Sequence, residues 1–113
     1  MSEPLPLRLT AAAEADLSEI WAWLAAEVSE DVAMRFVRDV KTAFEPMRHF
    51  PHAAPARDRL APGLRVTFHG AYAIYYQPRP DEIIIIRVLH GARDIAAIAE
   101  HGGFRAEGRS LDR

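Results

Sequence analysis

The chain has 113 residues, half of them hydrophobic, which provides enough apolar surface for one core and suits a single domain. It contains no cysteine, which excludes a disulfide framework and a thiolate metal site, and its net charge of −2 gives no reason to expect direct DNA binding. No apolar run reaches the length of a membrane span and the N-terminus lacks a signal-peptide pattern, so we expect a cytoplasmic protein without membrane contact.

The first segments predict an edge strand followed by a helix. The apolar run from Leu5 to Leu9 is interrupted by Pro6, which lacks a donor for a sheet ladder and favours an edge position. Thr10 is suited to cap the helix that follows. Steps of three and four then place an apolar stripe on one helical face: Ala13, Leu17, Ile20, Trp21, Leu24 and Val28. We expect this stripe, with Trp23 at its margin, to pack in the core rather than stack on nucleic-acid bases.

A second helix should begin almost immediately, so the two helices are predicted to form an antiparallel hairpin. Ser29 is suited to cap it, and its apolar stripe consists of Ala33, Phe36, Val37, Val40, Phe44 and Met47. Pro46 removes one backbone donor, which should kink or tighten the helix, and Phe50-Pro51 should end it. From His52 to Pro62 we expect an ordered loop.

Three apolar runs rich in β-branched and aromatic residues predict an antiparallel meander. They are Leu64 to His69, Tyr72 to Gln77 and Ile83 to His90, separated by residues typical of tight turns. Four consecutive isoleucines predict that the last strand is covered on both faces. A short helix should follow between Ala92 and Glu100. The predicted fold class is therefore α+β, with an N-terminal edge strand, a helix hairpin packed on the meander and a short C-terminal helix.

The chain is expected to form one domain over residues 1–113, with a core of about 5–100 and a flexible tail of 101–113. The tail is polar in composition, so we expect that removal of the last ten residues leaves folding intact.

Alternation along the strands suggests which side chains lie beneath the hairpin. The simplest arrangement buries there Leu64, Val66 and Phe68 of the first meander strand with Ile84, Ile86 and Val88 of the last. Arg65 and Arg87 then project together from the opposite face, within an apolar patch of Ile83, Ile85 and Leu89. Either a partner chain or the C-terminal segment is expected to cover this patch, and the purified protein alone is expected to be poorly soluble or to self-associate.

Charge is divided unevenly along the chain. From Ala11 to Glu45 the acids outnumber the bases by five, whereas from Arg57 to Arg93 the arginines outnumber the acids by three. The strand half is thus suited to an anion or an acidic partner, and ordinary surface variation accounts for the excess equally well.

Several titratable residues allow two interpretations. Arg87 is either functional or held in a structural ion pair with Glu82 or Asp94. His90, at the end of a buried strand, is either a hydrogen-bonded structural residue or a general base. His49 and His52 have metal-like spacing but no further ligand nearby, so we predict no metal site.

Taken in order, several motifs resemble the RelE/ParE superfamily, the toxins of bacterial type II toxin–antitoxin pairs. The resemblance covers about Leu7 to Ile98 and begins with LTAAAEADLSEIWAWL, which is similar to the family's first helix. Ala33, Phe36 and Phe50-Pro51 follow, and then GLRVTFHGAYAIYY, which resembles the family's Gly-x-Arg and Tyr-x-Ile-x-Tyr strands. IIIIRVLHGARD resembles the final strand and its exit. Each piece alone is a weak signal, whereas their order and spacing together are fairly specific.

The resemblance implies the fold predicted above and a partner. That partner is a cognate, ParD-like antitoxin with a DNA-binding N-terminus and an extended, often acidic segment that wraps the toxin in a hetero-oligomer. The resemblance implies no cofactor. It implies one of two activities. RelE-like members cleave messenger RNA on the ribosome, with Arg65, Arg87 and His90 as the catalytic candidates here. ParE-like members, associated with plasmid stabilisation, poison DNA gyrase by protein contact.

The ParE-like activity is favoured for three reasons. RelE-like enzymes generally present a strongly basic surface and carry a catalytic tyrosine near the C-terminus, whereas this chain has a pI of about 6.2 and no tyrosine after Tyr76. The residues VLHGARD that follow the last strand also resemble those of ParE-like members. We therefore expect a gyrase inhibitor that is not an enzyme. The mRNA endoribonuclease is the alternative, and an inactive homologue acting as a binding partner or co-repressor is a third. The residues expected to bind the antitoxin or the target are Arg65, Tyr75, Ile83, Ile85, Arg87, Leu89 and Arg93.

Overall fold

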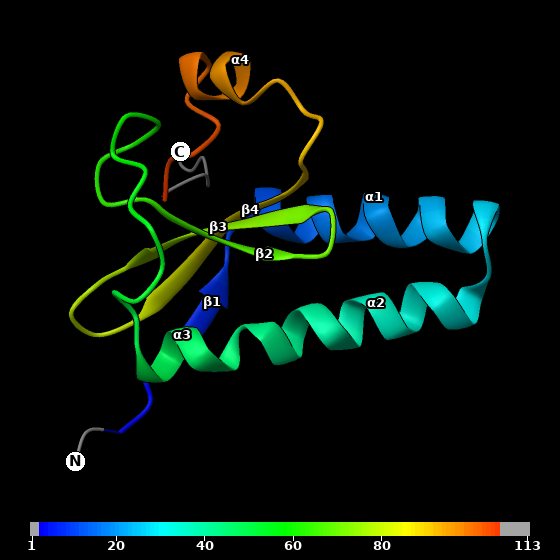
Figure 1. Cartoon of the computed structure of the whole chain (residues 1–113), viewed down its shortest axis with the longest axis horizontal. Coiled ribbons are helices and arrows are strands. Elements are labelled where there is room, and N and C mark those ends of the chain that lie inside the picture. Colours follow the sequence, from blue (N-terminus) through cyan, green and yellow to red (C-terminus); the bar gives the residue numbers. More distant parts are fainter. Residues whose placement is uncertain (1–2, 107–113) are drawn as a thin grey trace.

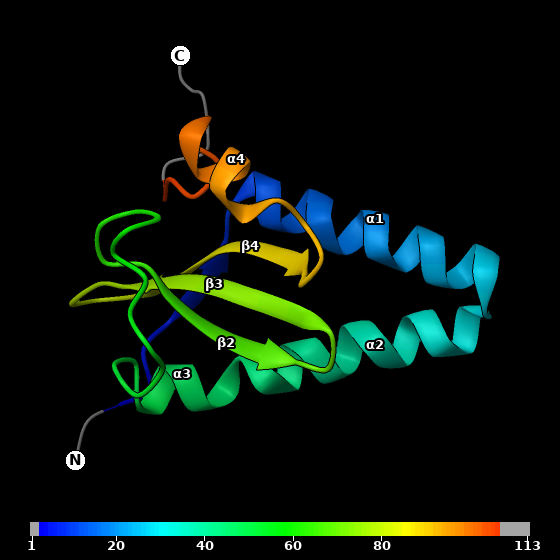
Figure 2. The ribbon, with the colours of Figure 1, turned by 45° about the horizontal axis from the view of Figure 1, so that its top comes forward.

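A computed structural model of the chain describes residues 3–106. In chain order the elements are β1 (Leu7–Leu9), α1 (Ala11–Glu27), α2 (Glu30–Ala43), α3 (Glu45–His49), β2 (Arg65–His69), β3 (Tyr72–Pro78), β4 (Ile83–His90) and α4 (Ile95–Glu100). The α1–α2 hairpin lies on one side of the sheet and α4 lies on the other (Figures 1 and 2). This arrangement confirms the predicted α+β fold.

The four strands form one sheet in the order β1-β4-β3-β2. β1 lies at the edge, as Pro6 indicated, and pairs in parallel with β4, whereas the other neighbours are antiparallel. Gly70 has a φ of 59° in the tight turn between β2 and β3, a conformation that glycine adopts without strain. The predicted meander is confirmed, and β4 is covered on both faces.

The helices begin at the predicted caps. Thr10 Oγ1 accepts a hydrogen bond from the Ala13 N–H at 3.0 Å, and Ser29 Oγ accepts one from the Val32 N–H at 3.1 Å. These bonds satisfy donors that a helix start leaves without partners. The break predicted near Pro46 is also present, since α2 ends at Ala43 and α3 begins at Glu45.

The sheet separates two apolar clusters. The hairpin cluster lies between the sheet and the α1–α2 hairpin and contains Ala13, Leu17, Val40, Phe44, Met47, Ile74, Tyr76, Ile83, Ile85 and Val88. The far cluster lies on the opposite face and contains Leu64, Val66, Ala73, Tyr75, Ile84, Ile86, Leu89, Phe104 and Ala106. Burial on both sides explains why the centre of β4 is apolar throughout.

The predicted assignment of faces is wrong for most of these side chains. Ile83 and Ile85 lie beneath the hairpin, whereas Leu64 and Val66 belong to the far cluster. Because β2 residues share a face with their β3 partners, Arg65 lies on the hairpin side with Tyr76. Four consecutive isoleucines carry no mark of which one faces which side, so a shift of one residue exchanges the faces.

An irregularity in β4 adds to this difference. Tyr75 pairs with Arg87 and Tyr76 pairs with Ile85, so Ile86 has no opposite residue on β3. A bulge of this kind interrupts the alternation of side chains. It explains how Val88 lies under the hairpin, as predicted, although Ile86 faces the other way.

The C-terminal segment covers the far face of the sheet, but of the patch that we expected a partner or this segment to cover only Leu89 lies on that face. Phe104 is only 2% exposed, and its ring lies 4.7 Å from that of Tyr75. The packed part of the chain therefore extends past Glu100 to Ala106. Removing the last ten residues would remove Phe104, so the expectation that such a deletion leaves folding intact is revised. Residues 107–113, also assigned to the tail, lie outside the described residues.

Candidate functional site

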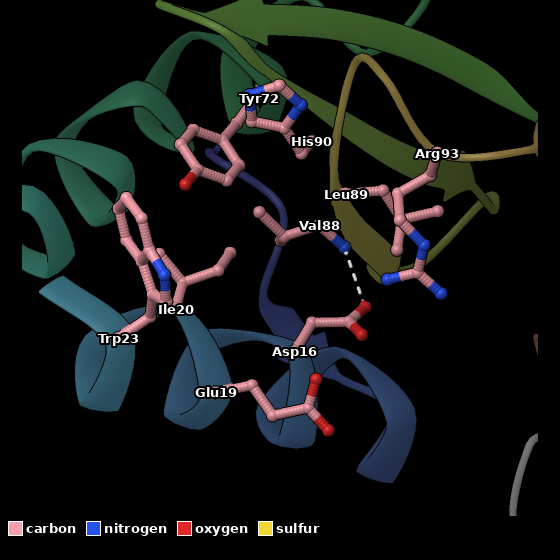
Figure 3. A pocket seen from close by; sticks show the side chains of 9 residues that line it. All are labelled: Asp16, Glu19, Ile20, Trp23, Tyr72, Val88, Leu89, His90 and Arg93. Atoms are coloured by element: carbon pink, nitrogen blue, oxygen red, sulfur yellow. Dashed lines mark hydrogen bonds between the residues drawn. The ribbon is translucent and has the colours of Figure 1, made fainter.

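A pocket of about 400 Å³ opens between α1 and the C-terminal half of β4 (Figure 3). It exists because β1 is short. β1 pairs only with Ile83, Ile84 and Ile85, so beyond Ile85 the outer edge of β4 faces α1. The pocket is lined by Asp16, Glu19, Ile20, Trp23, Tyr72, Val88, Leu89, His90 and Arg93. We call it the α1–β4 pocket.

The side chain that caps α1 and one side chain within α1 satisfy part of the open β4 edge. Thr10 Oγ1 donates to the Ile86 carbonyl at 2.8 Å, and Asp16 Oδ2 accepts from the Val88 N–H at 3.0 Å. Alternation along the strand directs the Val88 carbonyl and the His90 N–H toward the same outer edge. The described residues provide no hydrogen-bond partner for these two groups at that edge.

A bidentate ion pair with Arg87, which does not itself line the pocket, holds the pocket residue Asp16 against β4. Arg87 Nε donates to Asp16 Oδ2 at 2.7 Å, and Arg87 Nη2 donates to Asp16 Oδ1 at 2.9 Å. The side chains are 16% and 7% exposed, respectively. The hydrogen bonds that Arg87 donates to Asp16 raise the pKa of its guanidinium, burial opposes this by lowering the pKa, and the charges of Asp16 and Glu19 raise it further. Arg87 is therefore held in a structural ion pair, as one of its two interpretations expected, but its partner is Asp16 and not Glu82 or Asp94.

The floor and walls of the pocket are mostly apolar. Val88 and Leu89 are almost fully buried beneath it, and the rings of Trp23 and Tyr72 stand on one side of it (Figure 3). Trp23 is 58% exposed and Trp21 is 36% exposed, so the expectation that both tryptophans pack in the core is wrong. α1 carries apolar residues around most of its circumference. The spacing of these residues therefore could not show which of them pack against the sheet and which remain exposed to solvent.

Arg93 and His90 lie at the rim. Both residues are exposed, and the Arg93 side chain makes no hydrogen bond or ion pair with any part of the chain between residues 3 and 106. The His90 ring lies edge-on to Tyr72 at 5.2 Å, and its Nδ1 accepts a hydrogen bond from the Ala92 N–H at 3.0 Å. His90 thus has a structural bond and an exposed ring, and both of its interpretations remain open.

Arg65 lies elsewhere. Its Nη1 donates to the carbonyl oxygens of Ala54 at 2.7 Å and His52 at 3.2 Å, which ties the loop after α3 to β2. The prediction that Arg65 and Arg87 project together from one face of the sheet is therefore wrong. The guanidinium of each is already bonded within the chain.

The other predicted binding residues are buried. Ile83 and Ile85 lie in the hairpin cluster, and Tyr75 and Leu89 lie in the far cluster. Burial raises the pKa of the Tyr75 hydroxyl, against a smaller lowering by Arg57. Of the seven residues expected to bind a partner, only Leu89, in the floor, and Arg93, at the rim, line the α1–β4 pocket.

Sequence reasoning missed Asp16, Trp23 and Tyr72 as site residues. Asp16 had a signal, because an acid at a helical position next to Leu17 of the apolar stripe calls for a buried partner. Trp23 also had one, because it falls off the stripe. None of the described helices is long and apolar enough to cross a membrane, and residues 3–106 contain no cluster of three metal-ligating side chains.

Comparison with known proteins gives concordant matches. The sequence profile described as the ParE toxin of type II toxin-antitoxin system, parDE, matches residues 7–95. Toxin ParE1 of Mycobacterium tuberculosis (strain H37Rv) is 30% identical over 88 residues, which cover 77% of this chain and 90% of that protein. Toxin ParE1 of Caulobacter vibrioides is 27% identical over 92 residues, covering 81% of this chain and 95% of the relative.

Two solved structures share the fold. The chromosomal ParDE TA system from P. aeruginosa contains a chain that superposes with a TM-score of 0.68 at 22% identity, covering 79% of this chain and 98% of that one. The toxin-antitoxin complex RelBE2 from Mycobacterium tuberculosis contains one that superposes with a TM-score of 0.55 at 24% identity, covering 78% and 99%.

Proposed function

Since this chain belongs to the ParE family of toxins from type II toxin–antitoxin systems, we propose that it inhibits DNA gyrase by protein contact and that a cognate antitoxin neutralises it. In this proposal the toxin acts by binding, without a catalytic step. The antitoxin forms a hetero-oligomer with it in the cytoplasm.

The observation that carries the proposal is the separation of the three groups that a ribonuclease would need together. Arg65 is bonded to the loop after α3, and Arg87 is bonded to Asp16. His90 is on the rim of the α1–β4 pocket, with neither guanidinium among the pocket residues. Cleavage of RNA requires several cationic groups arranged around one phosphate, where negative charge develops in the transition state. Because these side chains do not converge on one point, the arrangement favours inhibition by protein contact over RNA cleavage.

The antitoxin part of the proposal is supported by a surface that the chain itself leaves open. The far face of the sheet is closed by Phe104 and Ala106. The α1–β4 pocket combines an apolar floor with an exposed tryptophan and an arginine whose side chain has no partner among residues 3–106. Tryptophan, tyrosine and arginine are residue types that are enriched at protein–protein interfaces.

The proposal is tested by inducing the chain without its antitoxin and pulse-labelling DNA and protein synthesis during the first minutes. We expect DNA synthesis to fail first. Purified chain should then block supercoiling by purified gyrase. The His90→Ala variant is the control for catalysis, because it removes the proposed general base of a ribonuclease and should arrest growth as the wild type does.

Earlier failure of protein synthesis, together with loss of toxicity in His90→Ala, would replace the gyrase proposal with the mRNA endoribonuclease. If the folded chain affects neither process, it is an inactive homologue that serves as a binding partner or co-repressor.

A further inference from the structure

A second pocket lies between the loop that precedes β2 and the start of α4. Its volume is about 600 Å³, and its lining includes Arg57, Arg59 and Leu60 of the loop, Tyr75 of β3 and Ile95 of α4. The loop and α4 lie on the same side of the sheet, and both pack against the far cluster (Figures 1 and 2). We call this cavity the loop–α4 pocket.

The backbone of the loop is held in place by its own hydrogen bonds. The Arg57 N–H donates to the Leu64 carbonyl at 2.7 Å, and the Leu60 N–H donates to the Arg57 carbonyl at 2.9 Å. Asp58 Oδ1 accepts a hydrogen bond from the Gly63 N–H at 2.8 Å, which closes the loop. Because the backbone that carries the two arginines is already fixed, less ordering is needed when a ligand binds.

Positive charge in the loop–α4 pocket is not matched by the rest of the chain. Arg57 and Arg59 are exposed, and neither forms an ion pair with any of residues 3–106. Arg57 Nη1 donates to the carbonyl of the preceding residue, Ala56, at 2.8 Å, and its other donors have no partner in that part of the chain. The acid between the two arginines, Asp58, is bonded to the backbone of the loop. Two guanidinium groups against one carboxylate leave a net positive charge, which favours an anion.

A buried hydroxyl group in the same pocket also lacks a partner. Tyr75 is only 7% exposed, and no residue among 3–106 forms a hydrogen bond with its hydroxyl. Burial raises the pKa of Tyr75, against a smaller lowering by the charge of Arg57, so the hydroxyl stays protonated at neutral pH. Buried polar groups are nearly always hydrogen-bonded, so this donor is available to a molecule in the pocket.

These groups together match a phosphate group on an organic molecule. Guanidinium groups bind phosphate through paired hydrogen bonds, and a phenol can donate to a further oxygen. Leu60 and Ile95 add apolar surface, and apolar walls with a few convergent polar groups are typical of small-molecule sites. Nucleic acid fits less well, because its backbone is held by many cationic contacts, whereas the whole chain has a net charge of −2.

From these observations we propose that the loop–α4 pocket binds a small organic phosphate. Arg57 and Arg59 bind the phosphate group, and the Tyr75 hydroxyl donates to one of its oxygens. The organic body lies against Leu60 and Ile95. The two pockets share no lining residue, so this site is separate from the α1–β4 pocket and goes beyond the proposed function.

The first test is titration calorimetry of the full chain with adenosine monophosphate as the probe. We expect binding that weakens as salt is added, because the contact is between charges at an exposed site. Ribose phosphate, which lacks the base, should bind more weakly than the probe, and adenosine, which lacks the phosphate, should not bind measurably. Equal binding of adenosine would overturn the phosphate contact, and equal binding of ribose phosphate would overturn the contact with the organic body.

The second test compares variants in the same titration. Arg57→Gln combined with Arg59→Gln should weaken the Kd for the probe at least about tenfold, because both charged donors are lost. Tyr75→Phe, which loses only the hydroxyl, should weaken it about threefold or more. The matched control combines Arg35→Gln with Arg38→Gln, which removes the same charge from exposed positions on α2, and should stay within about twofold of the wild type. Urea denaturation of each variant checks that the chain is folded.

Three results would overturn the proposed site. The first is a wild type that binds no probe at about 10 mM. The second is equal weakening by the pocket pair and the control pair, which would show that only the overall charge matters. The third is binding of a short DNA strand without binding of the monophosphate. In each case the chain can still block supercoiling by gyrase, so this inference and the proposed function fail separately.

Discussion

At the scale of single residues, Asp16 connects two parts of the structure that are far apart in the chain. Its two carboxylate oxygens accept from Arg87 and from the Val88 N–H, so one side chain joins α1 to β4. Breaking a buried pair leaves the remaining charge without compensation, which costs more than the pair itself contributes.

We predict that Asp16→Ala lowers the free energy of unfolding by about 3 kcal/mol or more, measured by urea denaturation. The control is Glu82→Ala, which breaks the pair with Arg8, whose side chains are 51% (Arg8) and 28% (Glu82) exposed. Because water screens that pair, its loss should cost less than about 1 kcal/mol. Similar losses for the two variants would contradict the assigned role of Asp16.

Tyr75 should make stability depend on pH in the alkaline range. Burial raises its pKa above the ordinary value of 10.0, so the folded chain favours the neutral phenol. Its contribution is fully present below about pH 10 and is lost at higher pH, where the unfolded chain ionises more readily.

We therefore predict that Tyr75→Phe loses less stability than the wild type between about pH 9 and pH 11, measured by urea denaturation at each pH. At pH 7 the free energies of unfolding of the two proteins should be nearly equal, since no residue among 3–106 accepts a hydrogen bond from the Tyr75 hydroxyl. An equal alkaline loss in both would mean that Tyr75 is exposed in solution.

At the scale of elements, the C-terminal segment acts as the second layer over the sheet. α4 is short, and its contribution depends on Phe104, which follows it and inserts against Tyr75. The composition of this segment is polar. A single aromatic residue among polar residues forms no hydrophobic pattern, so the sequence did not indicate that Phe104 is buried.

We predict that Phe104→Ala destabilises the fold by about 3 kcal/mol, as expected for an aromatic residue removed from a packed site. Arg105→Ala, at the next and exposed position, should change stability by less than about 0.5 kcal/mol. If both substitutions are equally mild in thermal or urea denaturation, the segment does not form part of the core.

The sequence was informative where the signal is local. Caps at Thr10 and Ser29, the break at Pro46 and the three meander strands follow from neighbouring residues, and all are present. The faces of β4 depended instead on a bulge at Ile86, whose carbonyl accepts a hydrogen bond from Thr10, 76 positions earlier in the chain. Site residues were harder still, because the α1–β4 pocket joins segments that lie far apart in the chain.

At the scale of the whole molecule, covering both faces of the sheet changes the expected behaviour in solution. The patch from which we predicted self-association is buried: Ile83 and Ile85 lie beneath the α1–α2 hairpin, and Leu89 lies in the far cluster with Phe104 of the C-terminal segment. Exposed apolar side chains remain, among them Trp23, Phe50 and Phe68, but they are separate from the far cluster.

We predict that the full chain sediments as a monomer and that a chain ending at Ile95 associates and binds a hydrophobic dye. The truncation exposes the far cluster, whose side chains are now almost inaccessible to water. Phe104→Lys in the full-length chain should shift both readouts in the same direction without a deletion. A truncated chain that stays monomeric and dye-free would show that this face needs no cover.

The parallel pairing of the first strand with the last has a consequence for synthesis. β1 finds its partner only in β4, and Asp16 bonds to a residue 71 positions later. Contacts so distant along the chain form late and slow the folding reaction. While the ribosome is still translating the meander, the first strand and helix have no sheet on which to pack. The pairing of β1 and the bonds of Asp16 can therefore form only after β4 has emerged, so a translation product that stops before that point lacks the partner strand of β1.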